Sequence, residues 1–259
     1  MSNKKRVGGS LDKALRQESE FRPVAVLSEG WELTKTTFSP LLGALVVALA
    51  ILVIAIMLVI QFMFGGELNL EEGNSTQILG LLQLLIMPPL MAAVHMMGIQ
   101  HSIGKKSRVN DVFMFLKRPF PLIITAIITS LIVQLPGMFA AGSILVLLII
   151  AFFSITLSMA LPLVAEYQLS PLQAVKTSFL VVIKRFFAFA TVYAAMLGLF
   201  IVAAIPFGLG LIWVAPMYYN VKGILYREIF GVATDENEAK TSHKAEDNDD
   251  SDNSNTWSA

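Results

Sequence analysis

Three polar residues in otherwise apolar stretches are the strongest candidates for chemistry. His95, Glu166 and Asn220 each follow a long apolar run and come a few residues after a proline. Polar groups at membrane depth are costly and therefore mark candidate sites. If the helices that carry the three residues adjoin, their side chains form an intramembrane polar cluster open to the cytoplasm. The alternative is that each lies separately among lipid headgroups, where polar side chains cost little.

The sequence lacks the residue patterns of common catalytic sites. It contains no Cys and three His, with no His-Glu-x-x-His run for zinc and no Gly-x-Ser-x-Gly turn for an acyl nucleophile. Glu166 has no second acid at the same depth, so a paired-carboxylate site is not indicated. We therefore expect a non-enzyme, with no catalytic residue, metal or cofactor. An enzyme acting on lipid through Glu166 and a basic interface is the weakest alternative.

The composition is that of an integral membrane protein. Hydrophobic residues make up 55% of the 259 and charged residues 15%, and the mean hydropathy is +0.68. These values lie outside the range of soluble globular proteins. Nineteen basic and nineteen acidic residues cancel to a formal charge of zero, so nothing indicates a nucleic-acid partner, and none is expected.

Six apolar segments are long enough to form membrane-spanning helices, which need about 20 residues to cross a hydrocarbon core of about 30 Å. The segments are 40–64, 78–99, 120–139, 143–165, 186–205 and 207–226. The predicted fold class is all-α: a polytopic membrane bundle of six transmembrane helices, arranged as three helical hairpins with interfacial amphipathic helices.

The distribution of basic residues predicts the topology. No Lys or Arg occurs within 36–104, 119–175 or 186–221, whereas the intervening segments are rich in both. Basic residues near helix ends stay on the cytoplasmic side. We therefore expect a multi-pass protein of the bacterial inner (plasma) membrane with both termini in the cytoplasm.

Three regions follow from these boundaries. Residues 1–22 are predicted to be a mobile cytoplasmic N-terminus, and 23–231 the six-helix transmembrane domain. Residues 232–259 are rich in Asp, Glu, Asn and Ser and cannot bury a core, so they are predicted to be a disordered acidic cytoplasmic tail.

Prolines recur in the second helix of each predicted hairpin. They are Pro88, Pro89, Pro162 and Pro216. Proline removes a helical N–H and clashes with the preceding turn, so each is expected to kink its helix. The recurrence suggests a threefold structural repeat. The alternative is that prolines are ordinary in transmembrane helices.

An amphipathic segment precedes each hairpin, beginning near Val24, Val109 and Leu172. Apolar residues at helical spacing give each segment one apolar face, which fits a helix lying in the membrane interface. In the third segment three basic side chains are expected to contact lipid headgroups: Lys176, Lys184 and Arg185.

The stretch 134–231 carries motifs of a known family. They are Leu135-Pro136-Gly137, Leu-Pro-Leu-Val at 161–164, Ser-Pro-Leu-Gln-Ala-Val-Lys-Thr-Ser at 170–178 and Tyr-Arg-Glu-Ile-Phe-Gly at 226–231. In these motifs the chain resembles the uncharacterised YciC-like bacterial inner-membrane proteins and the membrane region found with some glycerophosphodiester phosphodiesterases. The resemblance implies a six-helix inner-membrane protein without an assigned activity. The phosphodiesterase catalytic domain is missing, so that chemistry is not carried over.

Two functional interpretations remain. The first is a non-enzymatic protein that organises the membrane or supports a partner, with membrane lipids as partners and other membrane proteins or further copies of the chain as open alternatives. The second is a small transporter or channel component in which His95, Glu166 and Asn220 line a cytoplasm-facing cavity and the prolines provide broken helices.

Overall fold

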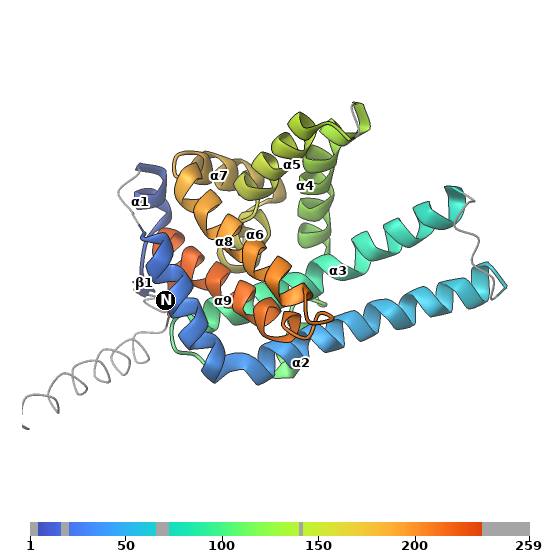
Figure 1. The fold of residues 1–259 in the computed structure, drawn as a ribbon, viewed down its shortest axis with the longest axis horizontal. Coiled ribbons are helices and arrows are strands. Elements are labelled where there is room, and N and C mark those ends of the chain that lie inside the picture. Colours follow the sequence, from blue (N-terminus) through green and yellow to red (C-terminus); the bar gives the residue numbers. More distant parts are fainter. Residues whose placement is uncertain (1–4, 17–20, 66–72, 140–141, 235–259) are drawn as a thin grey trace, which may run out of the picture.

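The computed structural model describes residues 5–16, 21–65, 73–139 and 142–234, which are largely helical (Figure 1). The helices are α1 (Leu11–Arg16), α2 (Pro23–Met63), α3 (Gly73–His101), the 3₁₀ helix η1 (Val109–Phe113), α4 (Phe120–Phe139), α5 (Ile144–Thr156), α6 (Ala160–Tyr167), α7 (Pro171–Ile183), α8 (Phe186–Ala204) and α9 (Leu211–Phe230). Two short strands, β1 (Lys5–Val7) and β2 (Val232–Thr234), pair antiparallel. The all-α prediction is confirmed, with this small sheet added. From residue 235 onward the predicted acidic tail lies outside the described residues.

Five helical stretches are long and apolar enough to cross a membrane, and they make this a multi-pass membrane protein. They are Pro23–Met63, Ser75–His101, Phe120–Phe139, Ile144–Tyr167 and Phe186–Ala204. The sixth predicted span, 207–226, differs from these. Its helix α9 begins only at Leu211, and it carries Lys222, Arg227 and Glu228, so by composition it is not among the five.

Helix α2 joins the first predicted interfacial segment and the first predicted span in one helix of 41 residues. Figure 1 shows that it changes direction along its length. The hydroxyls of Thr34, Thr36 and Thr37 donate to backbone carbonyls three or four residues earlier, at 2.6, 3.0 and 2.8 Å. Pro40 follows and has no N–H to donate. Because both features weaken the backbone ladder, they account for the bend.

The fourth predicted span, 143–165, is divided into α5 and α6 just before Pro162. The proline ring would clash with the backbone carbonyl of the preceding turn, so the helix opens there. Ser178 of α7 occupies the opening. Its hydroxyl donates to the Thr156 carbonyl at 2.8 Å and accepts the Met159 N–H at 3.2 Å. One buried side chain thereby satisfies two backbone groups that the break exposes.

Helix α9 is the most central helix and contacts α2, α3 and α8. Its buried residues extend from Val214 to Phe230. A Cβ atom on Gly223 would collide with the Gly98 carbonyl, and one on Gly98 would collide with the Tyr219 carbonyl. The absence of these side chains lets the backbones of α3 and α9 touch, as small residues do in membrane helix pairs.

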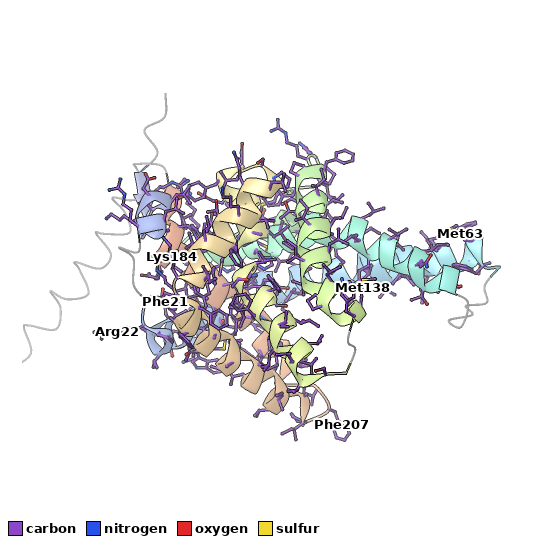
Figure 2. All side chains as sticks on the ribbon, turned by 90° about the horizontal axis from the view of Figure 1, so that it is seen from above. Phe21, Arg22, Met63, Met138, Lys184 and Phe207 are labelled. Carbon is purple, nitrogen blue, oxygen red and sulfur yellow. The ribbon has the colours of Figure 1, made fainter. Side chains whose placement is uncertain are left out.

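The outer surface of the described helices is strongly apolar. Figure 1 shows the second half of α2 and the first half of α3 projecting beyond the other helices. Figure 2 shows Phe21, Arg22 and Lys184 near one side of the protein, whereas Met63 at the end of α2, Met138 near the end of α4, and Phe207 in the turn between α8 and α9 lie farther from that side. Many large exposed side chains on these helices are apolar; examples are Leu49, Val53, Met57, Phe62, Leu131, Leu145, Leu148, Leu197 and Ile201.

Residues 5–16, which fall in the segment predicted to be mobile, form β1 and α1. Strand β1 pairs with β2 so that Arg6 faces Ala233. Helix α1 contacts α7 and α9, and its Ala14 is fully buried. We call residues 5–16 the N-terminal arm.

The other two predicted amphipathic segments also form helical structure. The second becomes the short helix η1, whose Val112 is buried. The third becomes α7, which begins at Pro171, one residue before the predicted start near Leu172; proline is favoured at the first position of a helix. Val175 and Val182 of α7 face the protein, whereas Leu172 is 70% exposed, so α7 has one buried face and one that is open.

Candidate functional site

His95 lies on α3 and contacts a buried lysine on α9. The His95 Nε2 atom is 2.7 Å from the Lys222 Nζ atom, and His95 Nδ1 is 2.6 Å from the Met91 carbonyl oxygen. A carbonyl oxygen can only accept, so Nδ1 donates to Met91 and the other nitrogen of the neutral ring, Nε2, accepts from Lys222. Lys222 is 7% exposed and His95 8%. The pair therefore places an amino group and a neutral imidazole in contact inside the protein.

Asn220 forms a second polar network, which joins α2, α3 and α9. Its Nδ2 atom donates to the hydroxyls of Thr34 and Thr37, each at 3.0 Å. Its Oδ1 atom lies 3.1 Å from His101 Nδ1, and the other His101 nitrogen lies 2.6 Å from the Ser107 hydroxyl. Asn220 is fully buried, and its amide hydrogens are both used. The network is suited to holding three segments together.

Glu166 of α6 forms a third network, with the N-terminal arm and the end of α9. Its Oε2 atom is 3.4 Å from the Arg6 guanidinium and accepts the Tyr226 hydroxyl at 3.0 Å. Its Oε1 atom accepts the Ala233 N–H at 3.1 Å. The Glu166 side chain is only 3% exposed. We call Glu166, Arg6, Tyr226 and Ala233 the terminal clasp.

Further contacts of Arg6 strengthen the terminal clasp. The guanidinium carbon lies 3.6 Å from the centre of the Tyr167 ring, a cation–π contact. Arg6 also donates to the Gly231 carbonyl at 3.1 Å, and the Tyr167 hydroxyl donates to the Phe230 carbonyl at 2.5 Å. The segments before α1 and after α9 are therefore joined through side chains as well as through the strand pair.

The hydrogen bonds place His95, Asn220 and Glu166 in three different networks, so the structure does not bring them together as one cluster. Each predicted residue is buried at a junction between helices and has its own partners. Sequence reasoning missed those partners. Lys222 in particular is a lone Lys within the apolar run 207–226, which is itself a signal of a buried polar contact.

The four prolines predicted to kink helices differ in whether the helix is continuous at the proline. Helix α3 is continuous through Pro88 and Pro89, and α9 is continuous through Pro216. Only Pro162 lies next to a division between helices, between α5 and α6. All four prolines are buried.

The three basic residues predicted to contact headgroups differ in their surroundings. Lys184 donates to the Leu15 carbonyl at 2.7 Å, and Arg185 donates to the Ala14 carbonyl at 3.0 Å. These carbonyls belong to the last turn of α1, where cations are favourable. Lys176 is exposed on α7. Contact of any of the three with headgroups stays a prediction.

Arg227, at the end of α9, ties the helix to α2. It donates to both carboxylate oxygens of Glu29, at 2.6 and 2.9 Å, and to the carbonyl of Ser102 at 2.5 Å. It also pairs with Glu228 at 2.7 Å. Burial acts to lower the pKa of Arg227, but the hydrogen bonds to Glu29 and Glu228 outweigh burial, so the pKa is raised from its ordinary value.

The described residues contain no group of three or more His, Asp or Glu side chains that could hold a metal ion. The polar networks have their donors directed at acceptors within the protein, an arrangement that positions helices. Comparison of the chain with protein-family models, with curated proteins and with solved structures found no match. The family resemblance of residues 134–231 therefore stays a prediction.

Proposed function

We propose that the chain is a bacterial inner-membrane protein that organises lipid and supports neighbouring membrane proteins without catalysing a reaction. The five long apolar helices and their exposed apolar faces support the membrane part of the proposal. The polar networks support the non-enzymatic part, because their members bond to one another and connect helices. The exposed small residues Ala194 and Gly198 on α8 offer a face on which another helix can pack closely.

The pairing of β1 with β2 is the observation that carries the proposed topology. Residues 5–7 and 232–234 form one sheet, so the segments before the first span and after the last lie on the same side. A chain whose two ends share a side must cross the membrane an even number of times. Five candidate spans then require α9 as the sixth, and its 20 residues give a length of about 30 Å, which is sufficient.

Contacts between helices support three hairpins. Consecutive crossings adjoin in each case: α2 with α3, α4 with α5, and α8 with α9. The segments around Met138 and Phe207 carry no basic residue, whereas those around Arg22, Lys106 and Lys184 do. By the preference of basic residues for the cytoplasm, both ends of the described chain are then cytoplasmic.

The transporter alternative receives less support. It requires His95, Glu166 and Asn220 to line one cavity, and their hydrogen-bond partners belong to three different networks. Flux that depends on Glu166 and His95 in reconstituted vesicles would restore this alternative.

Single cysteines test the topology, because the natural chain has none. Phe207→Cys is expected to react with an impermeant maleimide added to intact spheroplasts, and Lys106→Cys only after the membrane is opened. Reaction of Lys106→Cys in intact spheroplasts would contradict the topology.

For the function, the full chain purified in mild detergent is expected to carry lipid or a protein partner. A preparation that carries neither argues against an organising role.

A further inference from the structure

The segment between α3 and α4 carries exposed basic side chains without acidic partners. We call residues 105–118 the basic loop. It contains five basic residues and a single acid, Asp111. One oxygen of that acid is already used by the backbone, because it accepts the Arg108 N–H at 2.7 Å. The exposed cations of the basic loop form no ion pair with any residue that the structure describes; they are Lys106, Arg108, Lys117 and Arg118.

Several cations elsewhere in the protein have partners of their own. Arg227 pairs with Glu29, and Arg6 with Glu166. Lys184, which was predicted to contact headgroups, donates to a backbone carbonyl of α1. The basic loop differs from these sites because its exposed charge is not used within the described fold. It therefore offers a positively charged surface to a ligand from outside.

The basic loop lies at a membrane surface because it joins two candidate spans. Ser75–His101 precedes it and Phe120–Phe139 follows it. Lys117 and Arg118 come within three residues of Phe120, so at most about 11 Å of extended chain separates them from the start of that span. The basic residues place this surface in the cytoplasm. Headgroups of the cytoplasmic leaflet are thus the nearest anions to these side chains.

Exposed apolar side chains lie among the cations of the basic loop and at the start of α4. Phe113 is 41% exposed, Leu116 49% and Phe120 73%. Another side of η1 packs on α2, where a Cβ atom on Gly43 would collide with the Val109 side chain. Exposed apolar side chains beside Lys and Arg are typical of segments that lie in an anionic membrane interface. A soluble acidic ligand would use the cations but leave the apolar side chains in water.

We propose that the basic loop binds the headgroups of anionic phospholipids in the cytoplasmic leaflet. Its Lys and Arg side chains donate to phosphate oxygens, Phe113 and Leu116 contact the acyl chains beneath, and no covalent bond changes. A zwitterionic lipid brings its own cation, so an anionic lipid is favoured. This inference rests on the membrane location in the proposed function and names the class of lipid that the protein gathers.

The test uses the full chain in detergent and measures apparent dissociation constants for phosphatidylglycerol and phosphatidylcholine by native mass spectrometry. Wild type is expected to favour phosphatidylglycerol. Each surface cation contributes about fivefold to the binding of anionic lipid. The double variant Lys117→Gln/Arg118→Gln should therefore weaken phosphatidylglycerol binding about 25-fold and leave phosphatidylcholine binding unchanged. Lys117→Arg/Arg118→Lys keeps both cations and should keep the preference.

The matched control removes the same charge from another exposed place. Lys13→Gln/Arg16→Gln neutralises two exposed cations on α1 and should keep the preference for phosphatidylglycerol. A loss confined to the variant of the basic loop supports the proposal. An equal loss in both double variants overturns it, because net charge alone would then set the preference. A wild type that favours neither lipid overturns it as well, and so does a variant of the basic loop that binds phosphatidylglycerol like wild type.

The acidic residues beyond 234 are another source of negative charge in the chain. Carbodiimide joins Lys to Asp or Glu only where the two are in contact, so it tests this occupant in the full chain. In phosphatidylglycerol vesicles Lys106 and Lys117 are expected to form no cross-link with residues 235–252. A cross-link in these vesicles assigns the acidic residues as the occupant and overturns lipid binding.

Two checks separate this proposal from the proposed function. Lys106→Cys in the Lys117→Gln/Arg118→Gln background reports whether the loss of two cations inverts the hairpin; if it does, Lys106→Gln/Arg108→Gln, which keeps the cations next to α4, replaces it in the binding test. Lipid that co-purifies with the full chain without a preference for phosphatidylglycerol overturns the role of the basic loop and leaves the proposed function standing.

Discussion

Replacing Glu166 with Gln tests whether the terminal clasp holds the N-terminal arm in place. Gln keeps an oxygen for the Ala233 N–H, but its amide group faces the donors of Arg6 and Tyr226. Hydrogen bonds to charged groups contribute about 1.5–3 kcal/mol each. The Arg6 side chain is 29% exposed, so solvent reduces its share. Together the two losses amount to about 2 kcal/mol, or about a 30-fold larger opening constant.

Amide hydrogen exchange measures this opening directly. The Gly9 N–H bonds to the Arg227 carbonyl at 2.9 Å and the Ala14 N–H to the Ser10 carbonyl at 2.8 Å, so both amides report on the arm. Glu32→Gln is the matched control, because it breaks an exposed pair with Lys35 of little energetic value. If the two variants exchange equally fast over residues 5–16, the clasp does not hold the arm and the reasoning is refuted.

Two further predictions concern packing within the bundle. Ser178→Ala leaves two buried backbone groups at the α5–α6 break without their partner. It should therefore lower the free energy of unfolding by about 2–4 kcal/mol, and the melting temperature with it. Its control is Ser154→Ala, on an exposed face, which should leave the melting temperature unchanged. Gly223→Ala forces α9 away from the Gly98 carbonyl and should lower the melting temperature, whereas Gly198→Ala has open space around its Cβ position and should not. A Ser178 or Gly223 variant that melts like its control contradicts the contact concerned.

Long apolar helices could be predicted from the sequence because their signal is local. The predicted segment 120–139 coincides with α4, and 186–205 differs from α8 by one residue. The predicted kink at Pro162 falls at the division between α5 and α6. The sequence could not indicate that Ser178 forms hydrogen bonds with the backbone groups at that division, because its hydroxyl comes from a separate helix.

The N-terminal arm could not be predicted for a similar reason. Strand β1 has three residues, too few to give a periodic pattern, and it exists only through pairing with residues 232–234 at the other end of the chain. The polar residues were predicted as candidates because buried polar groups are rare in apolar helices. The division of these polar residues into separate networks could not be predicted, because it depends on which helices adjoin and on the rotation of each helix about its own axis.

The least apolar of the proposed spans, α9, contacts three of the others, α2, α3 and α8, and the same residues explain its composition and its contacts with α2 and α3. A lysine near the centre of a membrane helix opposes insertion by about 3 kcal/mol, so Lys222 makes α9 a poor span by itself. Within the bundle Lys222 bonds to α3, Asn220 to α2 and α3, and Arg227 to α2. Lipid gives apolar helices little reason to associate, so these contacts supply the specificity that apolar surface lacks. Helix α9 is therefore expected to depend on α2 and α3 for its insertion, and the polar groups that oppose insertion are the ones that fix its position.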